Sequence, residues 1–349
     1  MKAVVIHGKK EDFRYEDVAD PKAGEDEVVV KVRRCGICAI DPKIFHGSAF
    51  FSQTVYDHAP IIAGHEYIGE VVELGPGAKE KYGLKIGDKA IAEVIIPCGE
   101  CYFCKHGRYN LCNTPGFVGL NGPDGSWAEY MKFTKGSIVW KVPDELPWEV
   151  AVAIEPLAGG IHGAGRANIQ LGDIVVVMGG GPIGLLMLQA AKLKNPILLI
   201  AVDRHDEKLN IAKELGADLV LNPQKEDVVK KVKELSGGLG CDVVLEVTGN
   251  PKGVEMSVDM LRRGGRMMEY GVFTEQPNFD FSIIVDKELE IMGALLGTWA
   301  YPQAIKFLTE GLVKTDKIVT HNFLLKDWKK AIETSEKHLE NSIKVTMTP

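Results

Sequence analysis

The chain has 349 residues, of which 45% are hydrophobic and 26% charged, and its net charge is −7. This length exceeds what one ordinary core holds, so we expect two domains. The acidic balance argues against nucleic acid as a partner, because that binding depends on neutralising phosphates. Apolar runs such as residues 174–178 are too short to span a bilayer, and the N-terminus becomes charged before a signal-peptide core could form. We therefore expect a cytoplasmic protein without a membrane partner.

Residues 1–153 are expected to form a β-rich first domain. β-Branched residues are punctuated there by Gly and Pro, a pattern typical of short antiparallel strands in a loop-rich fold. After a short N-terminal strand, the expected strands are 27–32, 67–74, 89–96 and 128–133. Around Trp148 the composition changes, and the Ala-rich stretch 148–165 has helical spacing.

Residues 154–295 are expected to form a second domain, in which strands and helices alternate. The expected strands are 173–178, 197–203, 217–221, 242–247, 265–270 and 288–295, and the expected helices are 181–194, 205–215, 225–235 and 251–261. The interior strands are nearly all apolar, as in a parallel sheet covered on both faces. This alternation predicts a doubly wound α/β domain. The remaining residues, 296–349, contain helical stretches at 301–310 and 327–338 and a strand at 342–347, and are expected to return to the first domain.

A glycine-rich turn follows the first strand of the second domain. Gly179, Gly181 and Gly184 fit the pattern G-x-G-x-x-G between a strand and a helix. The first glycine allows the tight turn, the second lets the backbone approach a pyrophosphate, and the third lets helix and strand pack closely. The helix N-terminus offers amide hydrogens to the anion. The turn therefore predicts a dinucleotide site.

The residues after the second and fourth strands complete that site. Asp203, nineteen residues past Gly184, is placed to accept hydrogen bonds from the adenosine ribose, which favours NAD over NADP. Arg204 keeps NADP open, because an arginine there can accommodate a 2′-phosphate. The predicted coenzyme-binding residues are Gly179, Gly181, Pro182, Ile183, Gly184, Asp203, Arg204, Val247 and Thr248.

Four cysteines stand within fifteen residues in the pattern C-x2-C-x2-C-x7-C. They are Cys98, Cys101, Cys104 and Cys112. Four thiolates at this spacing can surround one tetrahedral zinc ion and leave no position open for substrate. A pair of disulfides, or four unrelated buried cysteines, is the first alternative, but clustered thiols in an unsecreted chain usually serve metals. A nucleic-acid-binding zinc knuckle is the second, and the acidic net charge argues against it. We expect a structural zinc.

A second set of possible zinc ligands is dispersed along the chain: Cys38, His65, Glu66 and Glu155. One thiolate, one imidazole and one or two carboxylates leave a position for a water or substrate oxygen, which is typical of a catalytic zinc. Taken singly, each residue has a structural alternative as a buried thiol, a core histidine or a helix-end glutamate.

Four motifs together make the chain resemble a known family. The segments 35–38 (Cys-Gly-Ile-Cys) and 64–66 (Gly-His-Glu) accompany the four-cysteine loop and the glycine turn. Over essentially its whole length, the sequence resembles the zinc-dependent medium-chain alcohol dehydrogenases. The resemblance implies a GroES-like catalytic domain, a Rossmann coenzyme domain, two zinc ions per subunit, and a homodimer or homotetramer formed through the last strand of the coenzyme sheet.

The resemblance also implies roles for individual residues. It places the catalytic zinc on Cys38, His65 and Glu66 or Glu155, with Asp41 orienting the ligands. An alcohol would bind the zinc and pass hydride to the nicotinamide. Many relatives relay the proton through a hydroxyl two residues after the cysteine, where this chain has Ile40. We hypothesise instead that the proton leaves through zinc-bound water and Glu155 or Glu66.

The implied substrate is a small polyol oxidised at a secondary alcohol, because Glu66 beside His65 and Pro156 after Glu155 are the arrangement of the polyol and threonine branches. L-Threonine and butanediol are the alternative substrates. The candidate pocket residues are Phe51, Tyr56, Phe117 and Trp299. For each of them, the alternative role is packing in the hydrophobic core.

Overall fold

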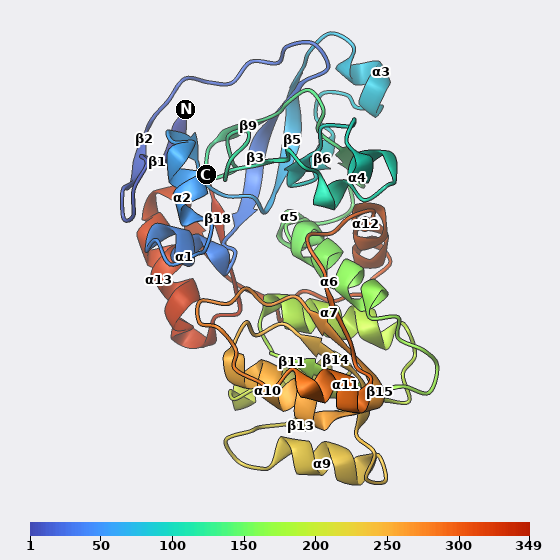
Figure 1. Ribbon diagram of the computed structural model, residues 1–349. Coiled ribbons are helices and arrows are strands. Elements are labelled where there is room, and N and C mark those ends of the chain that lie inside the picture. Colours follow the sequence, from blue (N-terminus) through green and yellow to red (C-terminus); the bar gives the residue numbers. More distant parts are fainter. The chain divides into compact units, whose positions relative to one another are not determined.

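The computed structural model describes residues 1–349 and divides into two compact units (Figure 1). The first unit consists of Met1–Glu155 and Tyr301–Pro349, and the second of Pro156–Ala300. The first is rich in antiparallel strands, and the second alternates strands and helices around a parallel sheet. The predicted fold class is confirmed. None of the helices is both long and apolar enough to cross a membrane.

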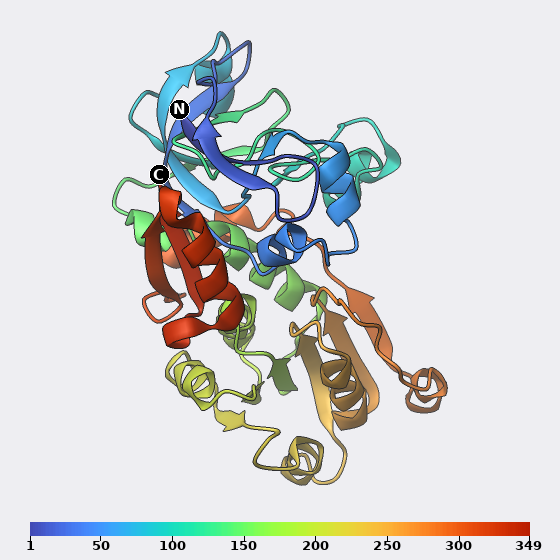
Figure 2. The ribbon, with the colours of Figure 1, turned by 90° about the vertical axis from the view of Figure 1, so that its left-hand side faces the viewer.

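The main sheet of the first unit has the order β10-β6-β5-β3-β18-β17, and β9 also pairs with β3. Its strands are β3 (Val28–Gly36), β5 (Tyr67–Leu74), β6 (Lys89–Ala92), β9 (Tyr130–Phe133), β10 (Val139–Val142), β17 (Val319–Leu324) and β18 (Lys344–Thr348). The valine-rich β3 lies at the centre, because its β-branched side chains fit a sheet buried on both faces. The C-terminal strand β18 pairs antiparallel with β3, so the end of the chain completes the sheet (Figure 2).

Smaller elements surround this sheet. The remaining strands are β1 (Lys2–Ile6), β2 (Phe13–Asp17) and β4 (Ile61–Ile62), which form one sheet, and β7 (Ile95–Ile96) and β8 (Gly116–Phe117), which form another. The helices are α1 (Ile40–Phe45), α2 (Ser52–Asp57), α3 (Ala78–Tyr82), α4 (Tyr102–Lys105), α5 (Trp148–Ala151), α12 (Tyr301–Thr309) and α13 (Trp328–Lys337). In both views α13 lies beside β17 and β18 (Figures 1 and 2).

Two details of the first unit differ from the sequence-based expectation. The predicted strand 89–96 is broken into β6 and β7, because the Glu93 N–H donates to Ile138 and the Val94 carbonyl accepts from Val118, which are separate segments. The short helices α1 to α4 were not predicted. With four to six residues each, they complete fewer than two turns and leave no helical period in the sequence.

The second unit is a six-stranded parallel sheet of order β13-β12-β11-β14-β15-β16. Its strands are β11 (Ile174–Met178), β12 (Leu198–Val202), β13 (Leu219–Leu221), β14 (Cys241–Glu246), β15 (Leu261–Glu269) and β16 (Glu290–Gly293). Its helices are α6 (Ile154–Arg166), whose first two residues belong to the first unit, α7 (Pro182–Lys192), α8 (Asp206–Glu214), α9 (Val228–Leu235), α10 (Pro251–Met260) and α11 (Ser282–Lys287). The strand order reverses beside β11, so the carboxyl ends of β11 and β14 flank the place where such sheets bind dinucleotides.

The Ala-rich stretch 148–165 forms two helices, α5 and α6, instead of one. Pro156 explains the restart, because a residue without an N–H is tolerated in the first turn of a helix and not in its interior. Likewise, α7 begins at Pro182, and Gly181 precedes it as an extended N-cap residue.

Candidate functional site

Cys38, His65 and Glu66 come together in the first unit. Cys38 precedes α1, and the other two precede β5. One ligand atom from each side chain lies within 4.8 Å of the others. His65 and Glu66 are buried, and Nδ1 of His65 has no hydrogen-bond partner. A soft thiolate, an imidazole and a carboxylate that converge in a buried place fit a zinc ion.

Two glycines make this convergence possible. A Cβ on Gly36 would stand 2.1 Å from Oε2 of Glu66. Gly64 has φ = +90°, and a Cβ there would stand 2.1 Å from the Trp127 ring. Both glycines flank predicted ligands, so the local motifs reflect packing around the site as well as backbone conformation.

Asp41 connects two of the three candidate ligands. Its Oδ2 accepts a hydrogen bond of 2.8 Å from the Cys38 N–H, and its Oδ1 lies 3.7 Å from Nδ1 of His65. Burial raises the pKa of Asp41 to about 6. Burial, together with the Glu66 and Asp41 carboxylates, also raises the pKa of the Cys38 thiol. A thiol beside two carboxylates ionises readily only when a cation balances the charge, which is what a metal supplies.

Glu155 lies outside the group of three but interacts with it. It occupies the first turn of α6. Burial, and then the Glu66 carboxylate, raise the pKa of Glu155 to about 7. Since His65 and Lys344 also act on Glu155 electrostatically, its carboxylate belongs to the same charged neighbourhood. The structure thus brings Cys38, His65 and Glu66 together, while the ligand atoms of Glu155 are not part of that group.

Lys344 is a residue of this site that sequence reasoning missed. It is 3% exposed on β18, where Nζ forms an ion pair with Glu66 and donates a hydrogen bond of 2.9 Å to the Ile37 carbonyl. Burial lowers the pKa of Lys344, but the Glu66 carboxylate and Cys38 outweigh burial, so the pKa is raised. A single lysine near the C-terminus gives no sequence signal, because only the pairing of β18 with β3 brings it to the site.

The four cysteines also converge. Their sulfurs lie within 4.8 Å of one another, with 3.5 Å between those of Cys101 and Cys104. All seven cysteines of the chain are free thiols, so the disulfide alternative is wrong. The Cys98 N–H points to the Cys112 sulfur at 3.3 Å, and the Cys101 N–H to the Cys98 sulfur at 3.4 Å. Backbone donors aimed at sulfur favour thiolates, and those of Asn113 and Cys104 lower the pKa of Cys101 to about 6. The donor set fits a closed zinc site.

The glycine turn joins β11 to α7. A Cβ on Gly184 would stand 1.8 Å from the Gly179 carbonyl oxygen, so helix and strand pack closely there. A Cβ on Gly179, which has φ = +114°, would stand 3.0 Å from Thr248 and 3.2 Å from Val247, so these predicted residues adjoin the turn. By contrast, a Cβ on Gly181 would meet nothing within 4 Å. The backbone is therefore open where a pyrophosphate would approach.

Asp203 is fixed beside the turn. Its Oδ2 accepts a hydrogen bond of 2.7 Å from the Gly180 N–H, and its Oδ1 accepts one of 2.8 Å from the His205 N–H. Arg204 donates through Nε to the His205 ring at 3.0 Å. Lys208, which sequence reasoning did not select, is 7% exposed beside Gly180. The sequence signal that could have identified Lys208 was its position on α8, five residues after the predicted coenzyme-binding residue Asp203.

The four predicted pocket residues are spread over different elements of the fold. Phe51 and Tyr56 lie at α2 and Phe117 in β8, all in the first unit, whereas Trp299 belongs to the second unit and is 60% exposed. The Tyr56 hydroxyl donates to the Ile44 carbonyl, which gives it a structural role.

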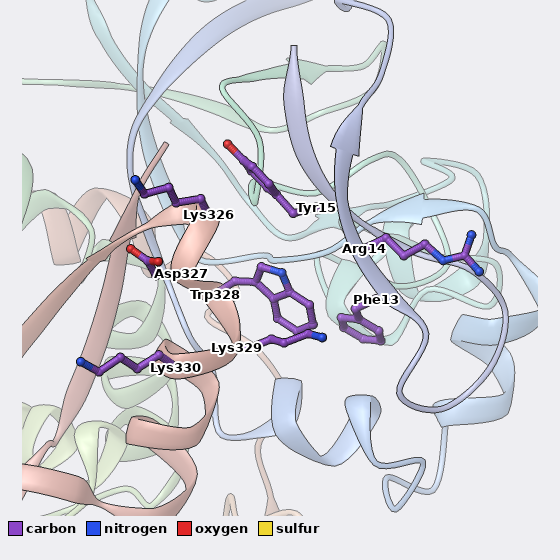
Figure 3. Close-up of a pocket in the computed structure, with 8 residues that line it drawn as sticks. All are labelled: Phe13, Arg14, Tyr15, Lys326, Asp327, Trp328, Lys329 and Lys330. Atoms are coloured by element: carbon purple, nitrogen blue, oxygen red, sulfur yellow. The ribbon is translucent and has the colours of Figure 1, made fainter.

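A separate surface pocket of about 510 Å³ lies in the first unit between β2 and the start of α13 (Figure 3). Its lining residues are Phe13, Arg14, Tyr15, Lys326, Asp327, Trp328, Lys329 and Lys330. Arg14 is bound to Asp12 at 2.7 Å, and Lys329 lies over the Trp328 ring. None of the predicted site residues lines this pocket.

Comparison with known proteins gives the family of the chain. Residues 24–144 match the alcohol dehydrogenase GroES-like domain, and residues 182–310 match the zinc-binding dehydrogenase domain. The chain is 40% identical over 355 residues to the erythritol/L-threitol dehydrogenase of Mycolicibacterium smegmatis, covering 100% of this chain and 98% of that protein. It is 33% identical over 350 residues to the sorbitol dehydrogenase of Bacillus subtilis, covering 100% and 97%.

A solved structure agrees with these relatives. A zinc-binding dehydrogenase of Sinorhizobium meliloti bound to NADP superposes with a TM-score of 0.89 at 28% identity, covering 100% of this chain and 99% of that one. The chain therefore belongs to the zinc-dependent medium-chain alcohol dehydrogenase family, as its motifs predicted. It is an oxidoreductase of the class that works with zinc and a nicotinamide coenzyme.

Proposed function

We propose that this enzyme oxidises a secondary alcohol of a small polyol to a ketone, and catalyses the reverse reaction, with NAD as coenzyme. The buried convergence of Cys38, His65 and Glu66 carries the proposal. The similarity to an erythritol/L-threitol dehydrogenase supports the substrate class. Initial rates of NAD and NADP reduction with three- to six-carbon polyols, butanediol and L-threonine test it. Turnover confined to L-threonine would overturn the polyol assignment.

In the proposed mechanism, Cys38, His65 and Glu66 hold the catalytic zinc, with Glu155 as the further carboxylate. Zinc at this position would act as a Lewis acid that lowers the pKa of the substrate hydroxyl and favours hydride transfer to the nicotinamide. Asp41 orients Cys38 and His65 through the contacts described above. Lys344 holds Glu66 by charge. The glycine turn, Asp203, Val247 and Thr248 bind the coenzyme, and the carboxylate of Asp203 favours NAD over NADP.

Glu155 is the proposed proton acceptor, because Ile40 offers no hydroxyl and Glu155 is the predicted carboxylate that does not converge with Cys38, His65 and Glu66. Glu155→Gln is therefore expected to lower kcat about 10²–10⁴-fold, whereas Ile40→Thr should change it little. Steady-state rates from pH 6 to 9 measure both variants, with zinc content as the control for metal loss. Wild-type turnover of Glu155→Gln at every pH would exclude this route.

The four-cysteine loop is proposed to bind a structural zinc, which makes two zinc ions per subunit. A cross-link that closes a loop of about fifteen residues stabilises the folded protein by about 3 kcal/mol. Cys101→Ser is therefore expected to lower the thermal midpoint by roughly 4 °C and to remove one zinc, while the remaining zinc still supports turnover. Calorimetry and metal analysis check this, with Cys241→Ser as a cysteine control outside both clusters. An unchanged zinc content in Cys101→Ser would contradict the assignment.

A homo-oligomer is also proposed. Strand β16 is the edge of the parallel sheet, and Ile291 on it is 39% exposed. An exposed strand edge is a natural pairing site for a second copy. The seven free thiols fit a reducing compartment, which supports a cytoplasmic location.

A further inference from the structure

Two carboxyl groups, one buried and one partly buried, meet in the second unit, away from both groups of candidate metal ligands. Glu246 is the last residue of β14 and Glu269 the last of β15, and the parallel register pairs them directly. Glu246 is 0% exposed, and Glu269 is partly buried. Paired residues of neighbouring parallel strands lie about 4.8 Å apart and point to the same face. The two carboxyl groups therefore share one small space.

The hydrogen bonds around the pair leave one oxygen unexplained. Oε1 of Glu246 accepts from the N–H of Thr248 at 3.0 Å and from its hydroxyl, and Oε2 accepts from the Gly249 N–H at 3.2 Å. Oε1 of Glu269 accepts from the Gly271 N–H at 2.6 Å, but its buried Oε2 has no partner. Two ionised carboxylates can only accept. A proton on Glu269 would turn the orphan oxygen into a donor to Glu246.

The charged groups on the neighbouring elements are engaged elsewhere. On β14 and β15, Asp242 pairs with Arg262, and Arg266 pairs with Asp173 at 2.6 Å. Two further cations have partners away from the pair: Arg263 pairs with Asp286, and Lys287 donates to the carbonyls of residues 258, 259 and 261. The remaining charged residues on the packed elements are not buried: Lys252, Glu255, Asp259 and Glu290. Since no cation compensates two adjacent anions here, a shared proton is the remaining way to stabilise the pair.

The pair joins loops that adjoin the glycine turn. A Cβ on Gly271 would stand 2.3 Å from the Gly249 nitrogen, so the loops after β15 and β14 are in close contact. Thr248, which donates to Glu246 through its N–H and its hydroxyl, lies against Gly179 of the turn. The position of Glu246 therefore fixes the loop that borders the proposed coenzyme site.

We propose that Glu269 is a positioning residue for coenzyme binding. As a neutral carboxylic acid it donates a hydrogen bond to the Glu246 carboxylate, which holds residues 247–249 against the glycine turn. Loss of that proton places two anions side by side, loosens the loop and weakens coenzyme binding. This inference rests on the proposed coenzyme site.

The proton affinity of Glu269 agrees with this arrangement. Burial, and then the Glu246 carboxylate, raise the pKa of Glu269 to about 9, from about 4.3 in an unfolded chain. Because the folded value is the higher one, the folded protein keeps a proton that the unfolded chain releases. The contribution of this proton to stability is therefore complete below the unfolded pKa and is lost as pH rises toward the folded pKa.

The test compares the zinc-loaded wild type with Glu269→Gln, whose amide is a permanent donor to Glu246. Titration with NADH by fluorescence should give a wild-type Kd that rises several-fold from pH 7.5 to 10, and a much flatter profile for Glu269→Gln. The thermal midpoint of Glu269→Gln should rise relative to wild type as pH increases from 5.5 to 9. Glu234→Gln, the same change at an exposed position of α9, should follow wild type in both measurements.

A second variant removes the donor altogether. Glu269→Leu should raise the coenzyme KM several-fold at every pH, with a much smaller effect on kcat and an unchanged zinc content. The proposal is overturned if Glu269→Gln follows wild type in both pH profiles, if only its stability profile changes, or if Glu269→Leu keeps wild-type coenzyme affinity. Absence of NADH binding by the wild type would instead refute the proposed coenzyme site, and the stability profiles would still report on the shared proton.

Discussion

Cys38→Ser is expected to abolish alcohol oxidation and to reduce the zinc content from two ions per subunit to one. Cys38 supplies the only sulfur among the converging ligands Cys38, His65 and Glu66. A bound Lewis acid contributes several kcal/mol to the transition state, so its loss corresponds to about a thousandfold or more in kcat. Metal analysis and steady-state kinetics measure the two effects.

Cys35→Ala provides the matched control for that variant. Cys35 lies three residues away, is fully buried, and donates to the Met347 carbonyl without joining the ligand group. We expect this control to keep both zinc ions and most of the turnover. If Cys38→Ser kept two zinc ions and wild-type kcat, the catalytic site would have to lie elsewhere.

Lys344→Met is expected to be among the most destabilising single substitutions in this protein. The variant leaves the Glu66 carboxylate, which is 2% exposed, without its cation. Breaking a buried ion pair by removing one partner costs about 3–5 kcal/mol. Denaturant unfolding of the zinc-free protein, in which Lys344 is the cation paired with Glu66, measures the loss, and Lys344→Arg should recover much of it by restoring the charge.

A double variant separates charge pairing from packing. When Glu66→Gln is added to Lys344→Met, no uncompensated carboxylate remains, so the loss should be smaller than the sum of the two single losses. Simple additivity would mean that the pair is not coupled, and that Lys344 stabilises β18 only by packing and by its bond to the Ile37 carbonyl.

The sequence predicted the elements of the second unit more completely than those of the first. In the second unit, the apolar strands and the glycine turn have strong local signatures, and the predicted strands correspond to β11 through β16. The helix α11 was not predicted, and β15 begins four residues before its predicted start. In the first unit, α1 follows Cys38 closely, but α1 and α2 are too short to leave a period in the sequence. The break between β6 and β7 depends on long-range backbone partners of Glu93 and Val94, which no local window contains.

The sequence by itself determined the family, the two sets of metal-binding candidates and the dinucleotide turn, because each depends on residue types at short fixed spacings. Only the tertiary structure decided which distant side chains interact. Lys344 reaches Glu66 because β18 pairs with β3, and Glu246 meets Glu269 because β14 and β15 run in register. Such contacts join residues far apart in the chain, and their energies arise from burial and charge in a shared space, which spacing along a sequence does not encode.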